Sequence, residues 1–402
     1  MTRRRNPLKS GLAGIADQSL IAITNLLLAF FAAQGGVNSL GSFALVGALY
    51  FSSLILMRAL LAEPYMAIGD TGARHFYGTV SLAFSLIGCA LTGVIAVAFF
   101  PMDIEWYLIP LLVLVLSMFE FARIKAYVEG RPGAALVGSI AALLVVACSG
   151  FVDTNFSPER WLALTWYWLA GGLLGYVFLI IRTGGLPAIT RGAWSWFIEH
   201  LLPRGKSLVL DSAGIVLVAH VGLFMISHNG SLTDVASVRA VTALLSPVSL
   251  VFTGLTISLT PALARSDPAS HRSTLRTFWI LILTVSLIAT VVVTTFGPQI
   301  IALVFGLSAV PEYRTLLVAV SSVVVFSLGA PLLAQVRVRG AYSIVAAVRL
   351  VTGIMTVVAL AQVGTGNYGL LFFSLQLGQA VLILVGAWFA LRPPRTIVRA
   401  EN

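Results

Sequence analysis

The residues of this sequence best suited to chemistry are charged side chains within long apolar stretches. They are Asp17, Arg58, Glu63, Glu120, Asp211, Arg239 and Arg349. A charge inside a membrane-spanning helix costs roughly 2.5–3.5 kcal/mol on insertion scales, so such residues face other helices or water and are candidates for function. Two interpretations stay open. The acids and arginines pair to fix a helical bundle, or the arginines line a chamber that binds an anion.

Four of these charges lie at a similar depth in the expected helices. They are Asp17, Arg58, Asp211 and Arg349. Each stands about 5–8 residues from the helix end on one side of the membrane, which is roughly 8–12 Å at ~1.5 Å per residue. Asp17 follows Gly11 and Asp211 follows Gly205 at the same spacing, which indicates a weak internal repeat of the kind found in transporters.

A polar stripe follows one of the apolar stretches from end to end. Its members alternate at spacings of three and four and are Arg239, Thr242, Ser246, Ser249, Thr253, Thr256 and Thr260. Those spacings hold one face of a helix. The stripe is ~32 Å long at ~1.5 Å per residue, about the thickness of a bilayer core. We therefore favour a face that lines a cavity, with helix packing through Ser and Thr as the alternative.

Shorter polar stripes occur in other apolar stretches from both halves of the sequence. The members are Asp17, Gln18, Thr24 and Asn25 near the start, Tyr342, Arg349, Thr352 and Thr356 further on, and Gln376 with Gln379 near the end. We predict that these faces meet in a polar surface between the two halves.

The composition requires a membrane environment for these residues. Hydrophobic residues make up 58% of the 402 residues and charged residues 10%, against about 25% charged in a soluble domain. The chain is therefore predicted to be an all-α polytopic membrane protein. A transmembrane helix needs about 20 mostly apolar residues. By this length the sequence predicts about 12 transmembrane helices, near 11–34, 40–63, 75–100, 106–123, 133–151, 161–182, 205–227, 235–263, 275–296, 312–335, 341–362 and 367–391.

The positions of the basic residues predict the orientation. With both termini in the cytoplasm, all but five of the 25 Lys and Arg residues lie in or beside the cytoplasmic loops. The exceptions are Arg160 and Arg314 outside, and Arg58, Arg239 and Arg349 within spans. The positive-inside rule accounts for this asymmetry. The net charge of +10 is thus explained by topology, and nucleic acid is not an expected partner.

The chain divides into two six-helix lobes, residues 1–182 and 205–402. Between them, residues 183–204 are expected to form a cytoplasmic linker. Within it Trp194, Phe197 and Leu201 share one helical face, which predicts an amphipathic helix on the inner leaflet. The apolar segment 297–309 before the tenth span leaves open a short half-helix.

Motifs of common enzymes are missing from the sequence. It has no phosphate loop, dinucleotide fingerprint, metal cluster or nucleophile elbow. We therefore expect neither catalysis nor a cofactor nor a metal site.

The stretch from Val238 to Arg265, VRAVTALLSPVSLVFTGLTISLTPALAR, resembles the multidrug/oligosaccharidyl-lipid/polysaccharide (MOP) exporter superfamily. The first two spans, GLAGIADQSLIAITNLLLAFFAA and GSFALVGALYFSSLILMRALLAEP, are similar in style. The nearest branch is the polysaccharide flippases, similar to the O-antigen (Wzx-type) flippases of bacteria.

The resemblance implies two lobes that rock about a central cavity in the bacterial plasma membrane, and a lipid-linked oligosaccharide as cargo. The cargo pyrophosphate would be held by cavity arginines. The candidate substrate-binding residues are Arg58, Arg239, Arg349, Gln18, Asn25, Thr242 and Ser246. Asp17, Asp211 and Glu63 would carry a coupling proton or cation, or hold the arginines.

Three alternatives remain. A drug/cation antiporter of the same superfamily needs a cavity dominated by acids and aromatics. A membrane glycosyltransferase or polymerase usually carries a large outer loop with catalytic acids, and here the longest outer loop is short. A major facilitator carries a Gly-Asp-Arg-Gly pattern that residues 69–74 match only in part.

Overall fold

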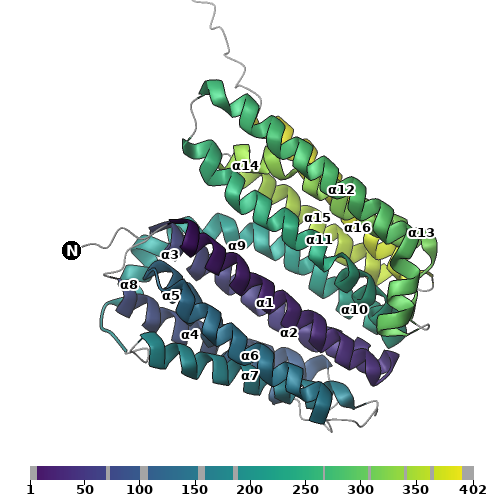
Figure 1. Ribbon diagram of the computed structural model, residues 1–402, viewed down its shortest axis with the longest axis horizontal. Helices are drawn as coiled ribbons and strands as arrows, with labels where there is room; N and C mark the ends of the chain where they lie inside the picture. Colours follow the sequence, from purple (N-terminus) through teal and green to yellow (C-terminus); the bar gives the residue numbers. More distant parts are fainter. Residues whose placement is uncertain are drawn as a thin grey trace, which may run out of the picture.

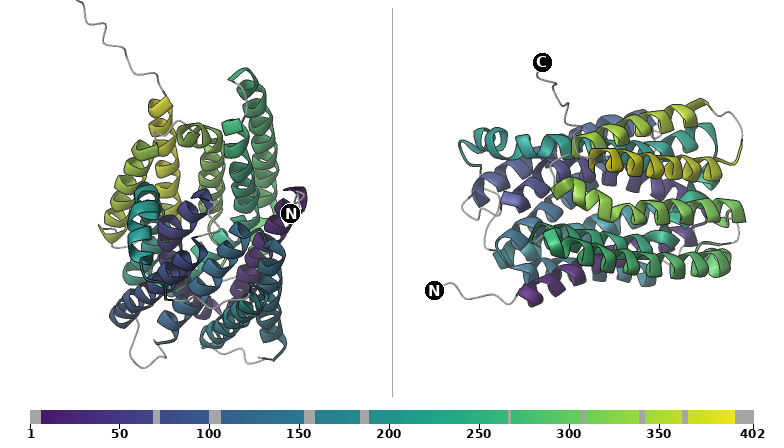
Figure 2. Two further views of the ribbon diagram at one scale, coloured as in Figure 1. Left: turned by 90° about the vertical axis from the view of Figure 1, so that its left-hand side faces the viewer. Right: turned by 90° about the horizontal axis from the view of Figure 1, so that it is seen from above.

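The computed structural model describes residues 7–68, 73–99, 107–152, 159–183, 189–265, 268–306, 309–338, 342–362 and 366–391. Nearly all of these residues are helical, and they contain no strand. The helices form two bundles side by side, one from each half of the chain (Figure 1). Viewed from above, the helices of both bundles run close to one common direction (Figure 2). This is the arrangement expected of a protein whose helices cross a membrane.

The first bundle contains six helical runs. They are α1 (Pro7–Gln34), α2 (Val37–Met57) continued by a π-helical turn (η1, Arg58–Ala62) and α3 (Glu63–Ile68), α4 (Arg74–Phe99), α5 (Leu108–Val128), α6 (Pro132–Val152) and α7 (Arg160–Thr183). Gly130 shows how the sequence ends α5. Its φ of 67° lets the Arg131 N–H donate to the Ala126 carbonyl at 2.7 Å, the bond that closes many helix C-termini. Pro132 then begins α6.

The second bundle also contains six runs. They are α8 (Ala193–Trp196), η2 (Phe197–Leu201), α9 (Leu202–Val216), η3 (Leu217–Val221) and α10 (Gly222–Asn229) in one run, then α11 (Leu232–Arg265), α12 (Pro268–Phe305), α13 (Tyr313–Leu328) with α14 (Ala330–Val338), α15 (Tyr342–Gln362) and α16 (Tyr368–Leu391). The expected all-α fold of about twelve helices in two lobes is confirmed.

Ten of these runs are long and apolar enough to cross a membrane on their own. The other two are α5 and α11. Helix α5 carries three charged residues, Glu120, Arg123 and Lys125, and most side chains of α11 after Ser249 lie outside the described residues. Both are nevertheless full-length helices inside the bundles.

Two boundaries differ from the expectation. The ninth span does not stop near residue 296, because α12 continues through Pro298 to Phe305. Most of the apolar segment 297–309 is therefore part of α12, where the sequence had left open a separate half-helix. A proline is tolerated there since neighbouring groups in a helix bundle can satisfy the freed carbonyl. The tenth span is α13 and α14, joined at Gly329.

The helix expected between the lobes is present from Ala193 onward, with one buried and one exposed face. Residues 184–188 lie outside the described part of the chain, and from Ala193 onward the helix continues directly into the seventh span. Trp194 is exposed, whereas Phe197 and Leu201 are buried. Phe197 packs against Phe84 of α4 with ring centroids 5.2 Å apart. One face of the segment therefore packs against the first bundle, while the opposite face, which includes Ile198 and Glu199, is exposed.

The two bundles touch where backbone approaches backbone. A Cβ built at Gly41 of α2 would lie 2.5 Å from the Leu232 carbonyl oxygen of α11, and one built at Gly205 of α9 would lie 2.9 Å from the Leu60 carbonyl oxygen. Small residues permit such contacts between membrane helices. Helix α9 thus lies against both bundles, since it also packs along α15.

Candidate functional site

A cavity of about 270 Å³ lies in the first bundle, and α11 of the second bundle contributes to its wall. Its polar lining residues are Gln18, Thr24, Asn25, Tyr50, Arg58, Glu120, Arg123, Ser139 and Ser246. The size approaches the lower end of the range for small-molecule sites. Four of the predicted substrate-binding residues, Gln18, Asn25, Arg58 and Ser246, therefore line one cavity.

Helix α1 forms one wall of the cavity with its polar face, as the stripe that includes Gln18, Thr24 and Asn25 predicted. Gln18 and Asn25 line the cavity with free amide groups, because no hydrogen bond engages either side chain among the described residues. Thr24 also lines it, but its hydroxyl donates to the Leu20 carbonyl at 2.8 Å within α1. Gln18 and Asn25 are the groups on this wall that can hydrogen-bond a ligand.

Aromatic rings form a second wall. The Tyr50 and Trp168 ring centroids lie 5.0 Å apart at 80°, and the Phe51 centroid lies 6.1 Å from Trp168. Phe51 also stacks on His220 of η3 at 6.2 Å and 17°. Such surfaces contact the apolar faces of a ligand while the amides fix its orientation.

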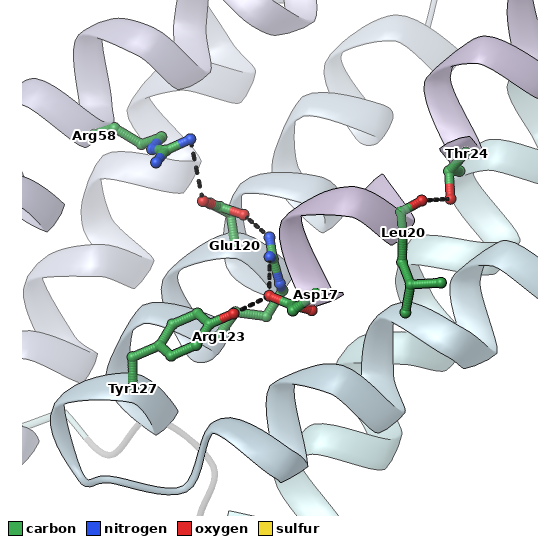
Figure 3. Close-up of polar contacts among 7 residues, drawn as sticks. All are labelled: Asp17, Leu20, Thr24, Arg58, Glu120, Arg123 and Tyr127. Atoms are coloured by element: carbon green, nitrogen blue, oxygen red, sulfur yellow. Dashed lines mark hydrogen bonds and ion pairs between the residues drawn. The ribbon is translucent and has the colours of Figure 1, made fainter. Parts of the chain in front are cut away.

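A buried ion cluster contributes Arg58, Glu120 and Arg123 to the cavity lining, and Figure 3 shows its contacts. Arg123 is its centre: its guanidinium donates to both Asp17 and Glu120. The Tyr127 hydroxyl also donates to Asp17. Glu120 in turn lies 3.5 Å from Arg58. Two acids and two arginines from α1, η1 and α5 are thus connected.

Burial differs sharply within this cluster. The Arg123 side chain is 1% exposed and Asp17 is 0% exposed, whereas the Arg58 side chain is 37% exposed. Burying an ion is costly unless partners compensate for its lost hydration, and Arg123 obtains this compensation from two carboxylates. Arg58 has one ion-pair partner among the described residues, Glu120 at 3.5 Å. It is the positive charge of the cluster that a ligand in the cavity can reach.

The second bundle contains a separate ion pair. Arg349 donates to Asp211 at 2.6 Å, and both side chains are buried. The Arg349 guanidinium also lies over the Phe326 ring at 5.5 Å. The Gln379 amide donates to the Arg349 carbonyl and to Thr352 Oγ1, at 3.2 and 3.1 Å.

The polar stripe of the eleventh span does not lie on the surface between the two halves, where it was predicted. Arg349, Thr352 and Thr356 are buried inside the second bundle and do not line the cavity described above. Asp211 pairs with Arg349, Gln379 donates to Thr352, and Thr356 donates to the Thr352 carbonyl, so these polar groups are satisfied within the bundle. The Tyr342 side chain lies outside the described residues.

Arg239 on α11 has no side-chain hydrogen bond or ion pair among the described residues. It is partly buried, its Nε atom is fully buried without a hydrogen bond, and no carboxylate of the described residues pairs with it. Two helical turns beyond Arg239, Ser246 reaches the cavity. Thr242 and Ser249 instead donate to carbonyls of their own helix, at 2.9 and 3.2 Å. The side chains of Thr253, Thr256 and Thr260 lie outside the described residues.

Glu63 and Arg123 show the limits of the sequence prediction. Glu63 begins α3, is exposed and does not line the cavity. Arg123, which the charge count assigned to the cytoplasmic edge, is the centre of that cluster. The spacing of Glu120, Arg123 and Tyr127 places all three on one face of α5, which is the signal that would have found it.

No protein-family model matches this sequence, and no curated protein matches it. Solved structures do match over nearly the whole chain. One is a multidrug resistance MATE family transporter of the MOP superfamily in its inward-facing conformation. It has a TM-score of 0.64 and 14% identity, over 94% of this chain and 97% of that chain.

The fold is that of the MATE transporters. A MOP superfamily transporter from Pyrococcus furiosus has a TM-score of 0.60 at 14% identity, over 95% of this chain and 94% of that chain. A MATE transporter in its outward-facing conformation has a TM-score of 0.54 at 13% identity, over 95% and 94%. The expected two-lobed MATE-like fold is thus confirmed, and the chain is a multi-pass membrane protein.

Proposed function

We propose that this protein is a transporter that flips an anionic, lipid-linked oligosaccharide across the bacterial plasma membrane by alternating access. The observation that carries the proposal is Arg58, a half-exposed cation in a cavity whose other walls offer amides and aromatic rings. Guanidinium groups bind phosphate oxygens in bidentate geometry. Free amides and aromatic rings suit the hydroxyls and apolar faces of sugars.

Arg239 supports the same cargo from the opposite bundle. A partly buried cation without a carboxylate partner among the described residues is unfavourable, and an anion would relieve the cost. Arg58 and Arg239 would then hold the pyrophosphate group in turn, or together, as the lobes move. Arg349 would stabilise the second bundle, since Asp211 already neutralises it.

The acids have a role in this scheme as partners of arginines. Asp17 holds Arg123 and Asp211 holds Arg349. A coupling proton or cation would have to compete with those arginines. Both termini would lie in the cytoplasm, as the distribution of basic residues predicts.

A drug/cation antiporter is the second candidate. The MATE fold suits it equally, and Glu120 beside the Tyr50, Phe51 and Trp168 rings is an arrangement that attracts organic cations. The two candidates differ in the sign of the cargo charge. Arg58 lines the same cavity as Glu120 and its side chain is more exposed, at 37% against 8%, which favours an anion.

The test uses purified protein in lipid vesicles with a fluorescent prenyl-pyrophosphate-linked sugar, and measures how fast the label becomes protected from an external quencher. Arg58→Ala and Arg239→Ala should each slow flipping about tenfold, because a hydrogen bond to a charged group contributes about 1.5–3 kcal/mol. Arg191→Ala, an exposed arginine between the lobes, is the matched control. Equal rates in all four proteins would overturn the arginine assignment.

A second arm measures uptake of ethidium into the same vesicles under a proton gradient. Uptake by the parent protein, with no movement of the labelled lipid, would instead establish the antiporter.

A further inference from the structure

A groove outside the central cavity lies between α4, α5 and α7. It is at the side of the membrane where α1 begins, near the first turns of α4 and the last turns of α5 and α7. Its volume is about 40 Å³, enough for a few waters or one compact polar group. None of the predicted substrate residues lines it.

The polarity of this groove changes along the helix direction. Lys125 and Thr183 lie within three residues of the ends of α5 and α7. Leu82 and Met118 lie about 8–10 residues from the corresponding helix ends, which is roughly 12–15 Å deeper at ~1.5 Å per residue. A polar end at the interface and an apolar end in the bilayer reproduce the polarity of a phospholipid.

Two polar groups in the groove lack partners. Tyr77 is 1% exposed, and its hydroxyl has no hydrogen bond in the described part of the chain. Its ring is fixed, because it stacks on Tyr65 with centroids 3.9 Å apart. Buried hydroxyls normally find a partner. The Lys125 ammonium has no carboxylate partner among the described residues, so the groove offers a cation and a hydroxyl donor.

The surroundings of the groove indicate where a ligand comes from. On α7 the neighbouring Val177, Phe178 and Ile181 are exposed, with Ile181 at 70%, and on α4 so is Leu86. Large apolar side chains exposed on a membrane helix face lipid. A ligand therefore reaches the groove from within the bilayer, with its chains along these side chains.

We propose that the groove binds the headgroup phosphate of an anionic phospholipid in the leaflet on the side where α1 begins. Lys125 pairs with the phosphate, and the Tyr77 hydroxyl donates to it. The acyl chains lie along the exposed apolar residues of α4 and α7. Basic pockets between helices on one side of the membrane are known to bind anionic headgroups. The site is independent of the cargo and of the central cavity.

The test measures phospholipid binding to the full-length protein in detergent by native mass spectrometry, with phosphatidylglycerol and phosphatidylcholine as probes. The parent protein should retain phosphatidylglycerol in preference. Lys125→Gln should lower the affinity about fivefold, as expected for one Lys at an anionic lipid. Lys206→Gln, which removes an exposed lysine of α9, should leave it unchanged.

Tyr77→Phe removes only the hydroxyl and keeps the ring stack, so it separates ligand contact from folding. It should weaken phosphatidylglycerol binding while the protein elutes as the parent does. Equal retention of both lipids, or equal binding by the parent and Lys125→Gln proteins, would overturn the proposal. Inorganic phosphate is the third probe: if it displaces phosphatidylglycerol at millimolar concentration, the site takes free phosphate and the lipid assignment is wrong.

Discussion

At the scale of single residues, the most consequential contact is the one Arg123 makes with two acids at once. Asp17 and Glu120 reach it from α1 and α5, and together with Arg58 they form a cluster of zero net charge. The cluster therefore serves two purposes. It fixes α1 against α5, and it leaves Arg58 directed towards the cavity with only one partner at 3.5 Å.

Arg123→Ala should destabilise the protein by about 3–5 kcal/mol, because it leaves two buried carboxylates without their cation. The measurement is thermal unfolding in detergent. Arg191→Ala removes an exposed arginine and should leave the transition within the error. A matching transition for both variants would mean that Arg123 is not the partner that compensates Asp17 and Glu120.

Asp211→Asn tests the second pair. It leaves the buried Arg349 without an ionised partner, so the free energy of unfolding should fall by a similar amount. The double variant Asp211→Asn, Arg349→Met removes both charges and should recover much of the loss, because apolar residues often replace buried ion pairs at little cost. Thermal unfolding of the three proteins gives the comparison. Failure of the double variant to recover would show that Arg349 contributes through more than its charge.

At the scale of helices, glycines determine how closely neighbouring elements approach. Helix α9 meets α15 at Gly214, where a Cβ would lie 2.6 Å from the Arg349 carbonyl carbon and oxygen. The close approach brings Asp211 and Arg349 within hydrogen-bonding distance. The same helix meets η1 through Gly205, so α9 packs against elements of both bundles.

Gly214→Ala should therefore push α9 away from α15 and cost about 1–3 kcal/mol, as overpacking does. Gly378→Ala is the control, because a Cβ there meets nothing within 4 Å, and it should be neutral or slightly stabilising since Ala favours a helix over Gly. Unfolding in detergent measures both. Equal behaviour of the two variants would contradict the close contact.

At the scale of the whole molecule, two six-helix bundles surround a cavity that is formed mostly by the first. Helix α11 reaches it through Ser246, so movement of the second bundle would change the shape and the access of the cavity. This asymmetry is compatible with rocking lobes. It also assigns the aromatic wall to one bundle and the unpaired Arg239 to the other.

The orientation of the molecule is tested by thiol labelling. After Cys89 and Cys148 are replaced by Ala, Arg191→Cys should react with an impermeant maleimide only in inverted vesicles. Tyr313→Cys, at the exposed start of α13, should react in intact cells. The opposite pattern would place both termini outside and reject the orientation drawn from the basic residues.

The sequence by itself determined the twelve helices, their approximate ends and their polar faces. These features follow from local hydropathy and periodicity, which act over neighbouring residues. It also identified four residues that line the cavity, Arg58, Gln18, Asn25 and Ser246. A polar group in an apolar helix needs water or a partner wherever the helix lies. The extra length of α12 and the packing of Phe197 against the first bundle went beyond this local information.

Only the tertiary structure decided which charges pair. Asp17 and Arg123 are 106 residues apart, and Asp211 and Arg349 are 138 residues apart. Partner choice depends on which helices are neighbours and how each is rotated about its axis, and neither is set by periodicity within one helix. For that reason Arg349 and Asp17, alike in the sequence as membrane charges near one depth, turned out to be neutralised in place. Arg58 keeps a partner at 3.5 Å, and Arg239 has no carboxylate partner among the described residues.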